Sequence, residues 1–511
     1  MPSLGSIARA ALRESGLLSV AGAGSDACLI ITTRSCRMFA HGASSLILAL
    51  FLAELGFSDS HIGLFMTLTL AGDVVFSLLL TLVADRVGRR RTLLAGSALM
   101  VASGTAFALC ENYWVLLAAA ALGVISTTGG DFGPFRSIEE SIVSELTTPA
   151  TRADVLVWYV TLSSLASSVS TEMSGRIIEW LRARDGWTLV DAYHSCFWLY
   201  VVMGLVNTGC TAMMSARCEL KVPKGTEQLI QQQQQRQEGV EDSLAGESEP
   251  LLGNGGSRSG RRETEEDSAT ADDGLNTEGK KAGGSWIAQI SHETLSIISV
   301  LWVLLMVDSL ADGMANMSLT SYYMDRKFHL PKSMLGDMIS VGGFLAALSN
   351  IFSGPLARYI GLVNTMVFTH IPSSAAVLAF PLAQSVPAAF ALLLIRVGLN
   401  KMDQGPRAAL IAAVVRQEER TAVMGITGVL RTLASTAGPS ITGLLASNDR
   451  FWVAFVAAGA LRLAYDIGVF VMFINIKLHK HEVTDDGSAD ADARREDGRD
   501  NAESPRAGTE A

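Results

Sequence analysis

Twelve long apolar segments dominate this sequence and constrain its fold more than any other feature. The first six cover residues 38–57, 61–83, 92–110, 113–138, 153–180 and 192–214, and the second six cover 294–320, 333–357, 362–383, 386–413, 421–446 and 450–476. Each has close to or above the roughly 20 residues that a helix needs to cross a bilayer. Backbone groups within lipid must bond inside their own segment, so the pattern predicts an all-α membrane protein.

Two polar segments divide the rest of the chain. Residues 216–290 contain nine Lys/Arg, fourteen Asp/Glu and a run of five Gln, and residues 477–511 contain six Lys/Arg and ten Asp/Glu. Such composition cannot bury enough apolar surface to fold. We therefore predict a cytosolic tail at 1–37, a six-helix bundle at 38–215, a disordered cytosolic linker at 216–290, a second bundle at 291–476 and a disordered acidic tail at 477–511.

The two groups of six segments resemble each other in sequence. Asp131-Phe-Gly-Pro134 matches Asp403-Gln-Gly-Pro406 at an offset of 272 residues, and Arg152–Gly175 aligns without gaps to Arg420–Gly443 at an offset of 268. Ser60–Gly63 also matches Ser333–Gly336. The offsets of these three alignments differ by only a few residues. This agreement indicates an internal duplication and predicts two pseudo-symmetric halves.

A dense run of charge joins the second and third apolar segments. This loop contains Asp85, Arg86, Gly88, Arg89, Arg90 and Arg91. It resembles the signature loop between helices 2 and 3 of the major facilitator superfamily, although Thr81 stands where that pattern usually has glycine. Two parallel six-helix halves are also the architecture of that superfamily, so the resemblance covers everything except the tails and the linker.

The resemblance implies a gating role for this loop. The family's acid, here Asp85, caps the amino end of helix 11, where unpaired amides favour an anion. Its arginine, here Arg86, pairs with an acid at the cytosolic end of helix 4, for which Glu140 and Glu145 are the options. Gly88 permits the tight turn, and the three following arginines hold the loop at the membrane surface.

The resemblance further implies that helices 1, 4, 7 and 10 line a central cavity. Polar residues recur there with helical spacing, and lipid would penalise each charge by roughly 2.5–3.5 kcal/mol. The candidate cavity residues are Asp131, Arg136, Glu139, Glu172, Asp308, Asp312, Asn316, Arg396, Asn400, Asp403 and Arg407. Arg462 and Asp466, on an outward-facing helix in the family, stand one turn apart and are expected to pair with each other.

Carboxyl groups in a low-dielectric interior can bind protons near neutral pH, which favours proton coupling through Asp131, Asp308, Asp312 or Asp403. Static ion pairs, Asp403 with Arg407 and Arg136 with Glu140, are the alternative role for these acids. Facilitated diffusion, or a receptor or scaffold that signals through the linker, are the alternative functions.

We expect a transporter rather than an enzyme, because no nucleophile–base–acid set or metal-ligand spacing is present. Its expected partners are a small organic solute, protons and the lipid bilayer, without nucleic acid or cofactor, and the expected state is a monomer. Basic residues in short loops favour cytosolic termini. An acidic dileucine-like run, Glu247–Leu252, leaves both the plasma membrane and a vacuolar or lysosome-like membrane open.

Overall fold

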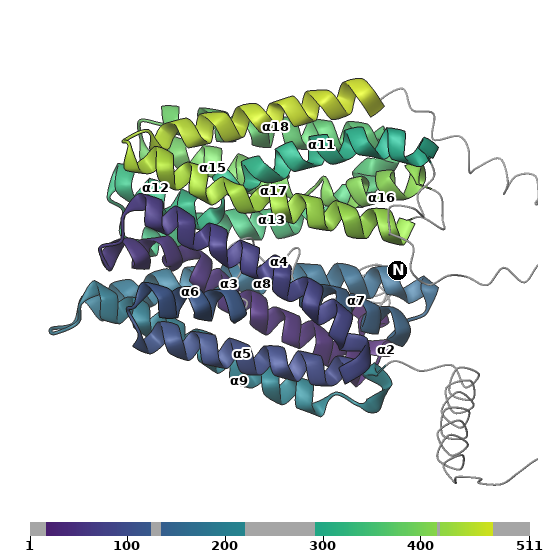
Figure 1. Ribbon diagram of the computed structural model, residues 1–511, viewed down its shortest axis with the longest axis horizontal. Helices are drawn as coiled ribbons and strands as arrows, with labels where there is room; N and C mark the ends of the chain where they lie inside the picture. The colour runs from purple at the N-terminus through teal and green to yellow at the C-terminus, as the bar shows by residue number, and fades with distance from the viewer. Residues whose placement is uncertain (1–16, 124–133, 220–291, 416–419, 474–511) are drawn as a thin grey trace, which may run out of the picture. The chain divides into compact units, whose positions relative to one another are not determined.

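A computed structural model describes residues 17–123, 134–219, 292–415 and 420–473, and the regular structure in these ranges is helical (Figure 1). The first half comprises α2 (Leu17–Gly22), α3 (Ser25–Glu54), α4 (Asp59–Val87), α5 (Arg89–Leu109), α6 (Tyr113–Leu122), α7 (Pro134–Leu146), α8 (Pro149–Arg182), α9 (Leu189–Met213) and the 3-10 turn η1 (Ala216–Cys218). The second half comprises α11 (His292–Met314), α12 (Met317–Phe328), α13 (Lys332–Ile360), α14 (Leu362–Ala379), η3 (Phe380–Leu382), α15 (Val386–Asn400), α16 (Gln404–Val414), α17 (Arg420–Ser447) and α18 (Phe451–Phe473).

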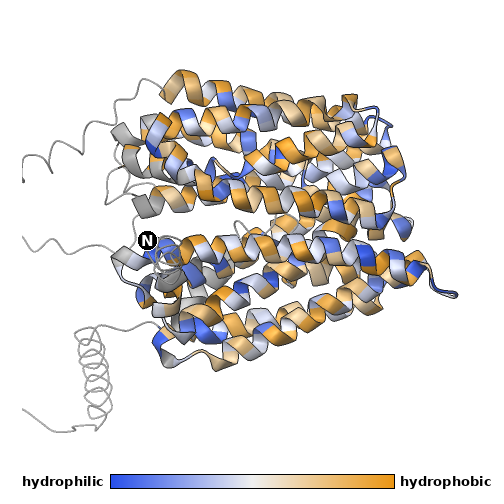
Figure 2. Ribbon diagram, turned by 180° about the vertical axis from the view of Figure 1, so that it is seen from behind, coloured by the Kyte–Doolittle hydropathy of each residue, from blue (hydrophilic) through white to orange (hydrophobic). Residues whose placement is uncertain are grey.

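These helices overlap all twelve predicted apolar segments, and α6–α7, α11–α12 and α15–α16 each fall on a single segment. Six of the described helices are long and apolar enough to cross a membrane by length and composition, or seven when the bent pair α11–α12 is taken as one span. Large apolar side chains such as Phe344, Leu205 and Trp198 are exposed on the outside, as lipid contact requires. Figure 2 shows hydrophobic residues along the lengths of the helices.

The first helix begins well before its predicted start at residue 38. Helix α3 starts at Ser25, because Ala27, Ile30 and Ile31 are buried and Asp26 accepts hydrogen bonds from the backbone and hydroxyl of Ser215. The basic residues of this stretch therefore lie within the helix rather than in a tail. The predicted linker and acidic tail fall almost entirely outside the described residues.

Each half packs in the same pattern. In the first half, α3 packs against α8 and α9, and α5 packs against α9. The equivalent helices of the second half make the equivalent contacts, α11 with α17 and α18 and α14 with α18 (Figure 1). The halves meet through α4 with α17 and α8 with α13.

Two pairs of glycines bring the halves into backbone contact. A Cβ atom added to Gly443 would lie 2.5 Å from the Asp59 carbonyl oxygen and 2.9 Å from the Gly63 Cα. One added to Gly175 would lie 2.5 Å from the Lys332 carbonyl oxygen and 3.2 Å from the Gly336 Cα. The sequence repeat aligns the members of these pairs with each other, so one close approach is the pseudo-symmetric copy of the other.

Polar contacts between the halves occur at the same end of the helices as the glycine pairs. The Asp59 carboxylate accepts hydrogen bonds from Tyr322 at 2.6 Å and Arg326 at 2.5 Å. The Lys332 amide donates to Glu179 at 3.1 Å, where α8 ends and α13 begins. We call this end, where α4 and α13 begin, the closed end.

Candidate functional site: a cavity between the halves

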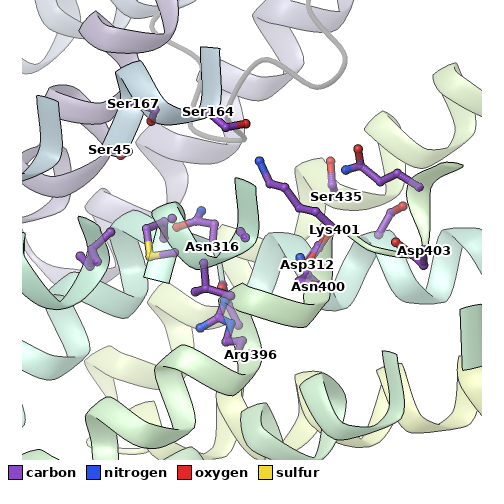
Figure 3. Close-up of a pocket in the computed structure, with 18 of the residues that line it drawn as sticks. Ser45, Ser164, Ser167, Asp312, Asn316, Arg396, Asn400, Lys401, Asp403 and Ser435 are labelled. Carbon is purple, nitrogen blue, oxygen red and sulfur yellow. The ribbon is translucent and has the colours of Figure 1, made fainter. Parts of the chain in front are cut away.

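A cavity of about 230 Å³ takes its lining residues from both halves of the protein. This volume lies below the roughly 300–1,000 Å³ of pockets for drug-sized ligands, so the cavity suits a smaller solute. Figure 3 shows serines from the first half on one side of the site and charged and amide side chains from the second half on the other.

The two walls differ in chemistry. The described lining of the first half contains hydroxyl, thioether and imidazole groups, namely Met38, His41, Ser45, Ser164, Ser167, Ser168 and Thr171. The lining of the second half contains three acids and five bases, namely Asp308, Asp312, Asp403, Arg396, Lys401, Arg407, Arg431 and Arg462. Almost all of the charge that faces a solute therefore comes from the second half.

Asp308 is the centre of the charged wall. Its carboxylate lies 3.7 Å from Arg407, 3.7 Å from Arg462, 3.9 Å from Arg431 and 3.7 Å from His370. The side chain is 1% exposed, and its Oδ1 atom has no hydrogen-bond partner in the described part of the chain. A buried acceptor without a hydrogen bond is uncommon in folded proteins, and such atoms occur at functional sites.

His370 connects Asp308 to a second buried acid. Its Nε2 faces Asp308 at 3.7 Å, and its Nδ1 lies 2.7 Å from Asp466. Asp466 also accepts a hydrogen bond from the Ser374 hydroxyl at 2.7 Å, which fixes the carboxylate beside the ring. An imidazole between two carboxylates has an acceptor for a hydrogen on each of its nitrogens.

Two other acids have direct basic partners. Asp312 accepts a hydrogen bond from Arg462 at 2.6 Å, and Asn400 accepts another from the same guanidinium nitrogen. Asp403 pairs with Arg407 one helical turn away. The Arg407 Nε and Nη1 atoms have no hydrogen-bond partner within the described residues.

Breaks in two helices position these groups. Helices α11 and α12 meet at an angle of 41°, and Asn316 caps α12 by accepting a hydrogen bond from the Leu319 amide at 2.9 Å. Arg396 donates to the Ala315 carbonyl at the break and to the Thr320 hydroxyl at 2.8 Å. A second break separates α15 from α16 at residues 401–403, beside Asp403. Discontinuous helices at a central site are common in transporters.

The cavity contains seven of the residues predicted to line it. These are Asp308, Asp312, Asn316, Arg396, Asn400, Asp403 and Arg407. Asp131 lies outside the described residues.

Three other predicted residues lie elsewhere. Arg136 pairs with Glu140 at 2.6 Å, and Glu172 pairs with the exposed Arg176. Glu139 is fully buried, where it pairs with Arg37 and accepts a hydrogen bond from Tyr159 at 2.7 Å.

The predicted gating loop is described in part. The side chains of Asp85 and Arg86 lie outside the described residues. Gly88 has φ 102°, a conformation that favours glycine, and precedes α5. Arg89 is 8% exposed and donates to Glu145 at 2.7 Å, rather than lying at the surface.

The two following arginines differ in their surroundings. Arg90 donates to the Ala212 carbonyl, and Arg91 is exposed. Glu219 accepts from the Arg89 amide at 2.8 Å and the Arg90 amide at 3.3 Å, and so caps the amino end of α5. An acid beyond η1 therefore stabilises the helix start that follows this loop.

Five titratable groups at or behind the cavity wall of the second half were not among the predicted cavity residues. They are His370, Lys401, Arg431, Arg462 and Asp466. The expected pairing of Arg462 with Asp466 was wrong, because Arg462 bonds Asp312 and Asp466 bonds His370. The signal available in the sequence was the presence of two opposite charges one turn apart on an apolar helix. In the structure, each of these charges pairs with a residue of a neighbouring helix instead.

The fold and the cavity define a helical membrane protein with a solute site between two duplicated halves. The model of the Major Facilitator Superfamily matches residues 30–248 and 301–500. The chain belongs to this superfamily, whose members are transporters and not enzymes.

The chain is also similar to individual proteins. The chain is 29% identical over 443 residues to the uncharacterized membrane protein YJR124C of Saccharomyces cerevisiae, covering 86% of this chain and 92% of that protein. Its fold is similar to that of the xylose transporter XylE from E. coli in an inward open conformation, with a TM-score of 0.61, 12% identity and coverage of 90% and 100%. A bacterial homolog to the human lysosomal transporter Spinster gives a TM-score of 0.55, 12% identity and coverage of 87% and 94%.

Proposed function

We propose that this protein moves a small organic solute through the central cavity by alternating access and couples that movement to protons. The observation that carries the proposal is the buried set Asp308, His370 and Asp466, which borders the cavity wall. Histidine is the side chain whose charge ordinarily changes between pH 5 and 8. The set therefore places an imidazole between two buried carboxylates beside the cavity.

The chemistry of this set connects proton binding to solute binding. A neutral His370 leaves two carboxylates beside one uncharged ring, whereas a protonated ring places a positive charge 2.7 Å from Asp466 and 3.7 Å from Asp308. Protonation changes the net charge around Asp308 by one unit. Because Asp308 is also within 4 Å of three arginines that line the cavity, the change alters the charge that a solute meets.

The orientation that fits the loop charges places the closed end outside and both termini in the cytosol. Arg89 and Arg90 lie at the opposite end of the helices from Asp59, where α4 finishes and α5 begins. Basic residues prefer the cytosolic side of short loops. The dileucine-like run, which leaves both the plasma membrane and a vacuolar or lysosome-like membrane open, lies outside the described residues.

The test uses purified protein in liposomes with an imposed pH gradient. The vesicles are incubated with a small-molecule extract of cells, and their contents are compared by mass spectrometry with those of protein-free vesicles. We expect at least one solute to accumulate only with the gradient, and Asp308→Asn to abolish this dependence. Asp185→Asn, an exposed acid between α8 and α9, is the matched control and retains it.

Accumulation that is indifferent to the gradient in the wild type would support facilitated diffusion instead. Accumulation of no solute in any protein-containing sample would favour the receptor or scaffold alternative. Gradient-driven accumulation that survives Asp308→Asn would show that Asp308 does not take part in coupling.

A further inference from the structure

We infer that the transported solute is a small organic anion, a carboxylate, and that the Lys401 ammonium is its charged anchor. The inference rests on the proposed transport function and names the substrate class of the same cavity. It follows from the count of charges around the cavity, from the partners of each charge and from the direction of Lys401.

The lining of the cavity has more positive than negative groups. Five bases face three acids among the described lining residues, an excess of two positive charges. Asp466, which lies behind His370, reduces the excess to one when the ring is neutral. A cavity with surplus positive charge attracts anions and repels cations.

The pairing of these groups identifies the source of the excess. Arg407 pairs with Asp403, Arg462 pairs with Asp312, and Arg431 lies 3.9 Å from Asp308. For the two remaining bases, Arg396 and Lys401, the described residues contain no carboxylate within ion-pair distance.

These two bases differ in their readiness to bind a solute. Arg396 is 6% exposed and already donates hydrogen bonds to the neutral Ala315 carbonyl and Thr320 hydroxyl. Lys401 is half-buried at the break between α15 and α16, and its side-chain ammonium has no hydrogen bond or ion pair with any described residue. Figure 3 shows it among the labelled lining residues, with its side chain extending across the cavity towards the serines of the first half. Lys401 is therefore the group that a solute reaches without displacing a protein partner.

The surroundings of Lys401 define the rest of the ligand. A carboxylate on its ammonium gains a charge-assisted hydrogen bond in a site with little water, where such bonds are strong. Ser164 and Ser167 on α8 provide hydroxyl groups for a polar, uncharged part of the solute. The buried Arg407, whose Nε and Nη1 atoms are unpartnered within the described residues, offers further donors on the same wall. A cavity of about 230 Å³ limits the ligand to a short-chain acid.

The test compares carboxylates with neutral molecules of the same shape. The melting temperature of the purified full-length protein is measured with increasing L-lactate, succinate or L-glutamate, with lactamide and succinamide as neutral counterparts and with putrescine as a cation. Ligand binding raises stability by mass action. We expect at least one carboxylate to bind at least tenfold more tightly than any amide or putrescine.

The variants locate the anion site. Lys401→Gln is expected to weaken carboxylate binding about 10- to 100-fold and to remove the discrimination against the amide, as loss of a hydrogen bond between charged groups predicts. Lys401→Arg keeps the charge and retains binding within a few-fold. Lys327→Gln is the control, because this lysine donates to the Pro381 carbonyl near the closed end, outside the cavity.

Three results would overturn the inference: no carboxylate stabilises the wild type, an amide or putrescine binds as tightly, or Lys401→Gln binds carboxylates as the wild type does. The proposed function has a separate outcome. If vesicles accumulate a neutral solute in response to the pH gradient and Asp308→Asn abolishes this, transport stands and the anion inference fails.

Discussion

Replacing Gly443 by alanine is expected to open the closed end. The added methyl group would lie 2.5 Å from the Asp59 carbonyl oxygen and 2.9 Å from the Gly63 Cα, both in the other half of the protein. Each neighbour is backbone, so no side chain can rotate away and α4 and α17 must separate. Overpacking of this kind costs about 1–3 kcal/mol, which shifts the equilibrium between closed and open ends about 5- to 150-fold.

Gly428→Ala is the matched control. It lies on the same helix, α17, but a Cβ atom there has no neighbour within 4 Å. Both substitutions remove a helical glycine and so gain about 1 kcal/mol of helix propensity. Of these two substitutions, only Gly443→Ala introduces the clash. Gly175→Ala is expected to introduce an equivalent clash at the second glycine pair.

The assay is a spin-label distance measurement across the closed end. Labels are attached to cysteines introduced at the exposed Arg184 and Asp449, one in each half, in a variant without the six native cysteines. We expect Gly443→Ala to add a longer distance that the wild type and Gly428→Ala populate weakly. Unchanged distances in Gly443→Ala, with normal folding, would refute the role assigned to the glycine pairs.

Three further predictions concern the cap of α5, the orientation in the membrane and the reactivity of Cys218. Glu219→Ala should lower the melting temperature by about 1–3 °C, because removing the cap of α5 costs about 0.5–2 kcal/mol, and an unchanged value in a thermal scan would contradict the cap. In the proposed orientation Cys28 faces the cytosol and Cys110 the outside. A membrane-impermeant maleimide should therefore label the exposed Cys28 only after permeabilisation, but label Cys110 in intact membranes. The opposite labelling pattern would show that the orientation is reversed. Burial raises the pKa of the Cys218 thiol to about 11. Because the thiolate is the reacting form, the rate of Cys218 alkylation in permeabilised membranes should rise about tenfold per pH unit from pH 8 to 10. A rate that stops rising near pH 9 would indicate an ordinary thiol.

The helical framework was accessible from sequence because lipid imposes a simple rule on length and polarity. Each predicted apolar segment corresponds to one or two helices, and the two halves pack in the same pattern, in keeping with the sequence duplication. The start of α3 was harder to place. Arg34 and Arg37 suggest a solvated tail, but Arg34 is 6% exposed and Arg37 pairs with the buried Glu139. A partner on another helix changes the meaning of a charge, and no local pattern reveals it.

The cavity was predicted best where polar residues repeat along one helix. Asp308, Asp312 and Asn316 share a face of one segment, and all three line the cavity. His370 and Arg462 each stand on helices that face outward in the family, so their contribution depends on contacts between helices that are distant in sequence. Lys401 follows Asn400 at a helix break, and the direction of its side chain depends on that break.

The central claim is that solute and proton move together through the Asp308 site. The most direct measurement follows the pH inside liposomes containing the protein and a trapped pH-sensitive dye, while a solute identified by the accumulation assay is added outside. We expect the solute to move protons in the wild type and in Asp185→Asn, and Asp308→Asn to abolish the proton movement. Solute uptake without any change of internal pH in the wild type would contradict the claim.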